Sequence, residues 1–137
     1  MRSWIYPANP KYYDVISAFT SKNKTPWPMS SNVEVGDIIY IYAGNPFKQI
    51  LFKCVVREIG LQEEEVRSYV EEYIRTQGKS TNKSFMMLKT IRNFEIDNSG
   101  PLCFGTLKMH GLKGSIMGPQ CLENNMELFK HIKIIEE

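Results

Sequence analysis

The sequence predicts a mixed α+β fold built around a curved sheet or small barrel. Short runs of β-branched and aromatic residues alternate with glycine- and proline-containing breaks, which is typical of strands and turns. Other segments carry apolar residues at the spacing of one helix face. The predicted order is strand, helix, hairpin, helix, strand, loop and helix, without an internal repeat. Because 137 residues suffice for one sizeable core but not for two, residues 1–137 are expected to form a single domain.

The central feature is a predicted hairpin within residues 34–56. Gly36-Asp37 is a turn signal, and residues 38–42 (Ile-Ile-Tyr-Ile-Tyr) have strand composition. Because no polar residue interrupts this run, both faces of the strand are expected to be covered. Residues 43–46 (Ala-Gly-Asn-Pro) break the strand, and residues 50–56 return as its partner. The irregular tip of such a hairpin can present backbone donors and acceptors to a ligand.

The other elements follow from the same signals. Two further strands are expected, at residues 4–6, where Pro7 ends the strand, and at residues 84–94. Apolar residues at helical spacing predict three helices, over residues 11–19, 60–78 and 124–135. Residues 101–112 fit either a strand end or a short helix.

The composition is that of an ordinary soluble globular domain, with 42% hydrophobic and 23% charged residues. No stretch approaches the roughly 20 apolar residues needed to cross a membrane, and no signal peptide is visible. Three scattered cysteines, Cys54, Cys103 and Cys121, argue against a disulfide framework and favour a reducing cytoplasm. A net charge of +2 is compatible with modest phosphate contact, and equally with an ordinary solvated surface.

Motifs that indicate an enzyme or a metal site are missing from the sequence. The two histidines, His110 and His131, lie in no nucleophile motif and are expected to be incidental. No two cysteines have the spacing of zinc ligands, and neither a Walker loop nor a dinucleotide fingerprint is present. We therefore expect no catalytic residues, no metal and no cofactor.

Aromatic residues beside strand ends and prolines are more informative. Stacking of such a ring on a planar base contributes about 1–3 kcal/mol per base, and the alternative for each ring is burial in the core. Trp27 lies between Pro26 and Pro28, which are expected to keep it out of a regular strand or helix, so it is the least core-like. The aromatic candidates are Trp4, Tyr6, Trp27, Tyr40 and Tyr42. The side chains that offer hydrogen bonds to a base edge, with turn or surface roles as the alternative, are Asn9, Asn45 and Gln120.

Several stretches, taken together, resemble the EVE domain, a member of the PUA-like superfamily that also holds the YTH and ASCH domains. The matching stretches are residues 4–14 (WIYPANPKYYD), Trp27, residues 35–42 (VGDIIYIY), residues 111–113 (GLK) and Gly118-Pro119. The resemblance runs nearly end to end, and residues 63–77 match least well. It implies a PUA-like small mixed β-barrel flanked by helices, with a pocket that takes one flipped-out nucleobase.

The resemblance also implies the residues of the pocket. Its walls are expected to be, in chain order, Trp4, Tyr6, Asn9, Trp27, Tyr42, Gly44, Asn45, Met117, Gly118, Pro119 and Gln120. Many EVE sequences have Glu-Pro where this chain has Asn9-Pro10, so the preferred hydrogen bond, and hence the preferred base, stays open. The lysines expected to contact phosphate are Lys22, Lys24, Lys48 and Lys113.

The function that this resemblance implies is non-catalytic reading of a modified base. The expected ligand is modified cytosine such as 5-methylcytosine, in DNA rather than RNA, and the expected partner is a nuclease domain or subunit of a modification-dependent restriction system. One alternative is an RNA-binding PUA-like protein. Another is an ASCH-like amidohydrolase acting on acylated cytidine, for which Lys22 or Lys24 with Thr25 supplies part of a lysine–threonine–carboxylate set. The chain fits a whole protein or a module of a larger one.

Overall fold

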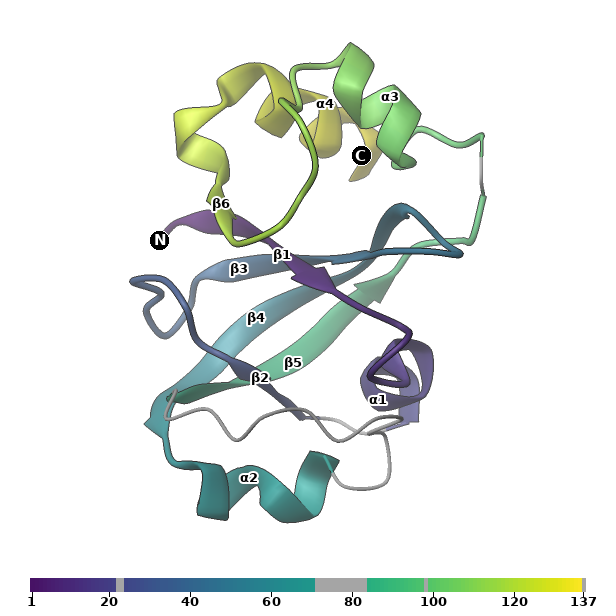
Figure 1. Ribbon diagram of the computed structural model, residues 1–137. Helices are drawn as coiled ribbons and strands as arrows, with labels where there is room; N and C mark the ends of the chain where they lie inside the picture. Colours follow the sequence, from purple (N-terminus) through teal and green to yellow (C-terminus); the bar gives the residue numbers. More distant parts are fainter. Residues whose placement is uncertain (22–23, 71–83, 98, 137) are drawn as a thin grey trace.

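The computed structural model describes residues 1–21, 24–70, 84–97 and 99–136. Figure 1 shows how its elements are arranged along the chain. The strands are β1 (Ser3–Ala8), β2 (Thr25–Pro28), β3 (Ile38–Ala43), β4 (Gln49–Leu61), β5 (Phe85–Asn93) and β6 (Gln120–Cys121). The helices are α1 (Val15–Ser21), α2 (Glu63–Val70), α3 (Phe104–Met109), the short 3₁₀ helix η2 (Leu122–Asn124) and α4 (Met126–Glu136). None of the described helices is long and apolar enough to span a membrane.

The six strands form one sheet in the order β2-β5-β4-β3-β1-β6. Strands β1 and β3 run parallel, and every other neighbouring pair is antiparallel. The ladder between β4 and β5 shifts register three times, and such irregularities bend a sheet and increase its twist. The sheet accordingly curls into a half-barrel, which confirms the predicted mixed α+β class with a curved sheet (Figure 1).

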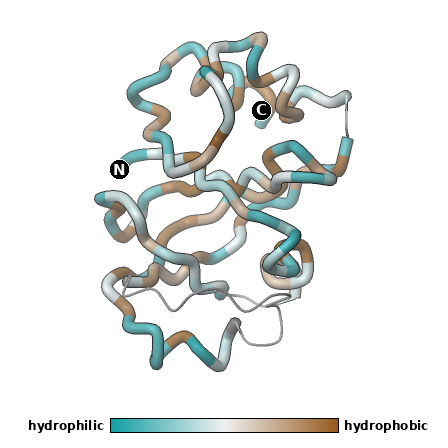
Figure 2. Tube along the Cα trace, in the orientation of Figure 1, coloured by the Kyte–Doolittle hydropathy of each residue, from teal (hydrophilic) through white to brown (hydrophobic). Residues whose placement is uncertain are grey.

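Strand β3 separates two hydrophobic cores. Side chains alternate between the faces of a strand, so Ile39 and Ile41 pack with α1, whereas Tyr40 and Tyr42 pack under α3 and α4. All four are buried, which confirms that both faces of this strand are covered. We call the face that packs with α1 the inner face and the opposite one the outer face. In Figure 2 hydrophobic residues recur along the central strands, while α2 is mainly hydrophilic.

The prolines near the sheet edges do not break their strands, contrary to expectation. The carbonyls of Arg2 and Ala8 accept hydrogen bonds from Ile38 of β3 and from Gly44, just after β3, at 2.9 Å each, so the nitrogen of Pro7 points away from β3. Strand β6 pairs only with Trp4 and Ile5, and therefore requires no donor from Pro7. The predicted end of this strand at Pro7 is wrong, since β1 continues to Ala8.

The expectation that Trp27 lies outside regular structure is also wrong, because β2 includes Trp27 and both of its flanking prolines. Met29 donates its N–H to Ser84 at 2.9 Å, so alternate residues of β2 bond to β5. The prolines occupy the other positions, so their nitrogens point away from β5, to the side of β2 where the described sheet has no further strand that requires a donor.

Two helices begin later in the chain than the apolar periodicity predicts. The first helix begins at Val15 rather than at residue 11, because the N–H groups of Tyr12 and Tyr13 turn back to the carbonyl of Asn9. Gly60, with a φ of 71°, lies in β4, and α2 starts at Glu63. Residues 71–78 of this predicted helix lie outside the described part of the chain. The open choice for residues 101–112 is resolved as the short helix α3.

Candidate functional site

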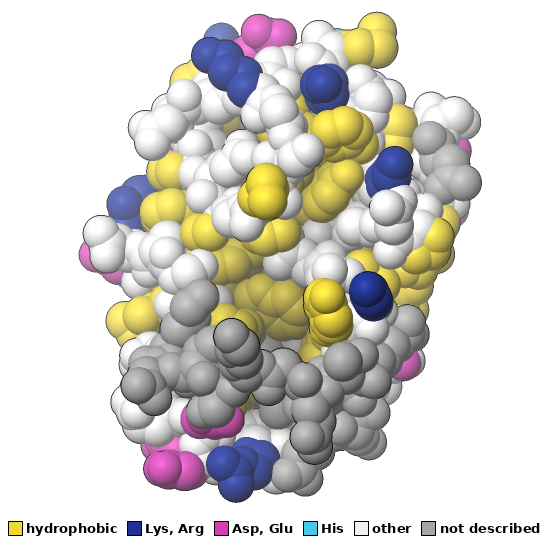
Figure 3. Space-filling model, viewed as in Figure 1, with side chains coloured by type: hydrophobic (Ala, Val, Ile, Leu, Met, Phe, Trp, Pro, Cys, Tyr) yellow, Lys and Arg dark blue, Asp and Glu magenta, His cyan; other side chains and the backbone are white. Residues whose placement is uncertain are grey.

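The inner face carries a cluster of aromatic side chains drawn from opposite edges of the sheet. Trp4 on β1 and Trp27 on β2 contribute to the same core although four positions separate their strands in the sheet order, which the curl of the half-barrel makes possible. The ring of Trp27 lies 5.4 Å from that of Tyr13 in an edge contact and 5.5 Å from that of Phe19. The inner aromatic cluster is defined as Trp4, Tyr6, Tyr13, Phe19, Trp27 and Phe52. In Figure 3 apolar side chains reach the surface in the middle of the face that carries β1 and α1.

Trp27 is the ring of the inner aromatic cluster that combines partial exposure with a position on an edge strand. It is half-buried, and β2 is the first strand of the sheet order. Ring contacts with Tyr13 and Phe19 brace the indole, and its neighbours Pro26 and Pro28 restrict the backbone that carries it. The indole therefore needs little further ordering to accept a flat ligand.

Trp4 and Tyr6, predicted as the first wall of the pocket, are core residues in the structure. Trp4 is 7% exposed and donates its indole N–H to Asp37 Oδ2 at 3.1 Å. Tyr6 is 2% exposed, and its hydroxyl hydrogen-bonds the hydroxyl of Ser31. Enclosed rings of this kind form the floor beneath the surface rather than a face on which a base can stack.

Asp37 holds this floor together. Its carboxylate accepts hydrogen bonds from the backbone N–H groups of Arg2 and Glu34, at 3.0 Å each, and from the indole of Trp4. Burial alone raises the pKa of Asp37, but these three hydrogen bonds and the nearby Arg2 guanidinium outweigh it and hold the pKa below its ordinary value of 3.8. The 1% exposed carboxylate is therefore ionised at neutral pH and links the start of β1 to the start of β3.

The lowered pKa of Asp37 predicts acid-sensitive stability. A folded-state pKa below the unfolded value of 3.8 contributes stability that is complete above pH 3.8 and is lost as the pH falls through the folded-state pKa. Urea unfolding followed by tryptophan fluorescence, from neutral pH to about pH 2.5, measures this loss. Asp37→Asn should flatten the profile, while Asp97→Asn, at an exposed carboxylate, should leave it unchanged. If the stability of Asp37→Asn depends on pH as that of the wild type does, the acid sensitivity comes from other groups.

The predicted hairpin-tip residues gather at the far ends of β1 and β3. Gly44 donates its N–H to the carbonyl of Ala8 at 2.9 Å, which brings the tip against the exposed Asn9. Asn45 is exposed as well, whereas the side chain of Asn9 accepts a hydrogen bond from Lys11 N at 3.0 Å, as in a turn. Tyr42 faces the outer side, 6.3 Å from Phe104, and so does not share a surface with the inner aromatic cluster.

Residues 117–120 lead into the short strand β6. Gln120 pairs with Ile5 in the sheet, and Met117 is 90% exposed. Gly118 and Pro119 are half-buried between them. The structure thus brings Trp4, Tyr6 and Trp27 into one cluster and Asn9, Gly44 and Asn45 into another, and places Gln120 beside β1.

The lysines predicted to contact phosphate do not form one surface. Lys24 lies 3.9 Å from Glu58, Lys48 is at the hairpin tip, and Lys113 follows α3; all three are exposed. Lys22 lies outside the described residues. A denser set of cations, missed from the sequence, occurs along β4 and β5. Lys53 and Arg57, four residues apart along β4, were the available signal.

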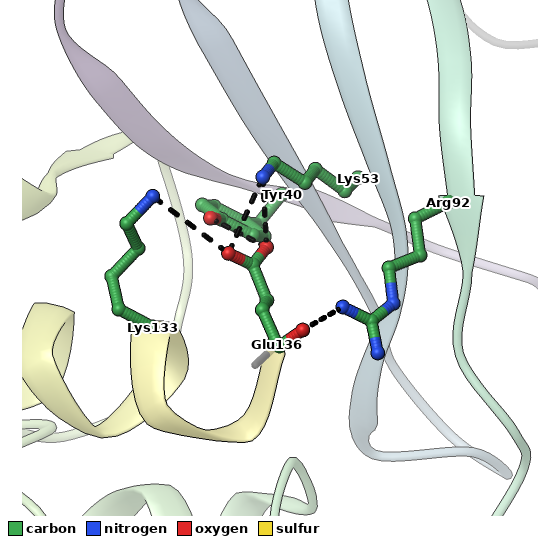
Figure 4. A network of polar contacts seen from close by, with 5 residues as sticks. All are labelled: Tyr40, Lys53, Arg92, Lys133 and Glu136. Atoms are coloured by element: carbon green, nitrogen blue, oxygen red, sulfur yellow. Dashed lines mark hydrogen bonds and ion pairs between the residues drawn. The ribbon is translucent and has the colours of Figure 1, made fainter.

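One carboxylate organises the outer face (Figure 4). Glu136, at the end of α4, accepts a hydrogen bond from the Tyr40 hydroxyl at 2.8 Å and pairs with Lys53 at 3.1 Å. Lys133 lies 3.9 Å from the same carboxylate, and Arg92 donates to the backbone carbonyl of Glu136 at 2.6 Å. Burial, followed by the hydrogen bond to Glu136 and its charge, raises the pKa of Tyr40 well above its usual range. The phenol therefore remains a protonated donor.

A cleft of about 210 Å³ also lies on the outer side, near the end of α4. The buried amide of Gln49 is fully engaged there, donating to the Glu95 carbonyl and accepting from Asp97 N, both at 2.8 Å. The lining contains none of the predicted pocket residues; it consists of Gln49, Phe94, Glu95, Asp97, Gly100, Pro101, Leu102 and Ile135.

Lys24 and Thr25, named for the amidohydrolase alternative, are each engaged elsewhere. Thr25 is buried and donates its hydroxyl to the Ala18 carbonyl at 2.9 Å, while Lys24 is paired with Glu58 at the surface. Within the ranges given above, no group of histidine, cysteine, aspartate and glutamate is suited to hold a metal ion.

The curled six-stranded sheet carries helices on both of its faces. No protein-family model matches the chain, and no curated protein matches it. Among solved structures, a serine-to-alanine mutant of ASCH from Zymomonas mobilis superposes with a TM-score of 0.67 at 12% identity, covering 98% of this chain and 96% of that chain.

Two further structures share this fold. A protein from Pseudomonas putida has a TM-score of 0.64 at 15% identity, covering 98% of this chain and 99% of its own. A hypothetical protein from Leishmania major has a TM-score of 0.63 at 13% identity, with coverage of 98% and 94%. At these identities the likeness establishes the fold, and the structural neighbours include ASCH proteins, relatives of EVE within the PUA-like superfamily.

Proposed function

We propose that the protein is a non-catalytic nucleic-acid reader of the EVE type that holds one flipped-out modified base, with modified cytosine in DNA as the favoured ligand. The observation that carries the proposal is the half-buried indole of Trp27 at the sheet edge, braced by Tyr13 and Phe19. The PUA-like fold and the EVE-like sequence stretches support the same function. A module of this kind serves as the sensor of a modification-dependent restriction system, with a nuclease as its partner.

In this proposal Trp27 stacks on the base, and Trp4 and Tyr6 form the rigid floor below it. Extraction of a base from a duplex costs a few kcal/mol, which stacking and hydrogen bonds to the base edge must offset. The exposed amides of Asn9 and Asn45 at the hairpin tip and the backbone of residues 117–119 supply those hydrogen bonds, whereas Gln120, which pairs with Ile5 of the outer core, faces away from this base. Tyr42 supports the tip from the outer side. The free thiols of the three cysteines favour a reducing compartment such as the cytoplasm.

Removal of the indole tests this function. Trp27→Ala should weaken binding to a duplex containing 5-methylcytosine by about 5- to 150-fold, because a stacked base contributes roughly 1–3 kcal/mol. Binding is measured by fluorescence anisotropy with matched modified and unmodified duplexes and with single-stranded RNA carrying modified cytidine. Trp27→Phe should retain much of the preference. The matched control is Phe129→Ala, which truncates a half-buried ring packed in the outer core.

Four results would contradict the proposal. The first is an unchanged preference for modified duplex in Trp27→Ala. The second is equal binding of modified and unmodified DNA by the wild type. The third is a preference for modified single-stranded RNA, which would favour the RNA-binding alternative. Deacetylation of acetylcytidine by the protein would assign it to the amidohydrolases instead.

A further inference from the structure

The outer face of the sheet carries a row of cations that the base-binding surface does not use. Along β4, Lys53 and Val55 share one face because alternate residues point the same way. The exposed Arg57 follows them at the register shift between Val56 and Glu58, as the extra residue of a bulge. The ladder to β5 sets Lys53 opposite Arg92 and Val55 opposite Lys89. Glu136 contacts both Lys53 and Arg92, which confirms that these strands present them to the same side (Figure 4). We call Lys53, Arg57, Lys89, Arg92 and Lys133 the outer basic row.

Among the described residues, the cations of the outer basic row outnumber the carboxylates that pair with them. Cations directly opposite one another on neighbouring strands destabilise a sheet unless a counter-charge lies between them. Among the described residues, the ion pairs of this row all end on Glu136, which neutralises one of five positive charges. Arg57 and Lys89 are exposed, and within the described ranges neither pairs with a carboxylate. A surface of this kind is complementary to a polyanion.

The row extends toward the edge strand that carries Trp27. In the ladder between β2 and β5, Thr25 pairs with Leu88, so their neighbours Lys24 and Lys89 meet at the end of the same ladder. Trp27 lies two residues beyond Thr25, about 7 Å along the strand at roughly 3.3 Å per residue. The outer basic row and Trp27 are therefore carried by neighbouring strands, β5 and β2, at one end of the strand order.

We propose that the outer basic row is the surface on which this protein holds the phosphate backbone of nucleic acid, with Arg57, Lys89 and Arg92 as its accessible cations. The inference rests on the proposed function for the identity of the polyanion. Backbone contacts position a nucleic acid without reading its sequence, and each one releases counterions. Affinity should therefore depend on salt through these residues, while base preference depends on the inner face.

The test is the salt dependence of binding by Arg57→Gln/Lys89→Gln. Each lost phosphate contact lowers the steepness of log K against log salt by about 0.9 for a duplex, so the double variant should lose about 1.8. The probe is an unmodified duplex, and the ratio of modified to unmodified affinity should stay at its wild-type value. Arg57→Lys/Lys89→Arg should keep the wild-type slope. Lys108→Gln/Lys130→Gln, an equal charge change at exposed residues of α3 and α4, should also keep it.

The outcomes separate this inference from the proposed function. A wild-type slope in Arg57→Gln/Lys89→Gln overturns the inference, and a retained base preference would leave the proposed function standing. A reduced salt slope in Arg57→Gln/Lys89→Gln, together with a wild-type protein that shows no base preference, supports the phosphate surface and contradicts the proposed reading of a modified base. Wild-type protein that binds vesicles of phosphatidylserine and phosphatidylcholine but no oligonucleotide overturns both. Thermal unfolding of each variant verifies that its fold is intact.

Discussion

Replacing Asp37 with alanine is expected to destabilise the protein by about 4 kcal/mol, the largest effect of any single substitution considered. Removal of the carboxylate leaves three donors without their acceptor: the N–H groups of Arg2 and Glu34 and the indole of Trp4. An unsatisfied buried donor costs roughly 1–3 kcal/mol, and more where the lost partner was charged. Asp37 is 1% exposed, so little water can replace the lost bonds. Asp37→Asn preserves the shape and should cost about 2 kcal/mol.

Chemical denaturation at neutral pH, followed by fluorescence, measures this effect. The matched control is Asp97→Ala, which removes an exposed carboxylate that accepts hydrogen bonds from the backbone N–H and hydroxyl of Ser99. Its cost should stay at about 1 kcal/mol, in the range of a lost local cap. Equal losses in the two alanine variants would mean that the Asp37 carboxylate does not bind the start of β1 to the start of β3. In that case the floor under Trp27 would also lack its proposed anchor.

The parts of the fold that were predicted correctly are those decided by local sequence. The run of residues 38–42 contains only β-branched and aromatic side chains, so both its strand character and its burial on two faces follow from composition. The class of the fold follows from the same reasoning, because strands and helices alternate along the chain. The sequence of residues 101–112, which contain the short helix α3, does not decide between helix and strand, because the apolar periodicity there is too weak.

The errors concern information that the local sequence does not contain. Pro26 and Pro28 seemed to exclude a strand, yet β2 lies at the sheet edge, where the missing donors face outward. Edge position depends on the strand order, which is set by pairings with residues about 60 positions later in the chain. Similarly, Trp4 is enclosed because Asp37, 33 residues away, accepts its indole N–H.

In the candidate site, too, local sequence predicted some features and long-range contacts decided the others. Trp27 was identified from its proline neighbours, but its contacts with Tyr13 and Phe19 depend on how α1 packs across the curled sheet. The outer basic row escaped notice because its members come from β4, β5 and α4 and become neighbours only through strand register and helix packing. Cross-strand and inter-element neighbours of this kind are the least visible in a single sequence.

The second large effect is expected at the end of α4, where Glu136→Ala should destabilise the protein by about 3 kcal/mol. The Glu136 side chain is 9% exposed and binds the Tyr40 hydroxyl at 2.8 Å and Lys53 at 3.1 Å. Its removal leaves a buried phenol without its acceptor and a largely buried ammonium without its counter-charge, and breaking such a pair from one side costs several kcal/mol. Urea unfolding of the full chain measures the loss. Glu127→Ala, at an exposed carboxylate in the first turn of the same helix, should cost only about 0.5 kcal/mol.

A double-mutant cycle with Tyr40→Phe separates the hydrogen bond from the ion pair. Because phenylalanine fills the same space without the hydroxyl, Tyr40→Phe removes one donor and leaves Lys53 paired with Glu136. Residues in direct contact typically couple by about 0.5–3 kcal/mol, and the short bond predicts a coupling of about 1–2 kcal/mol between Tyr40 and Glu136. If the two losses add without coupling, the stabilisation by Glu136 comes from Lys53 and Lys133. The cations of the outer basic row would then be held in place by charge alone, and Glu136→Gln should release α4 from the sheet as fully as Glu136→Ala does.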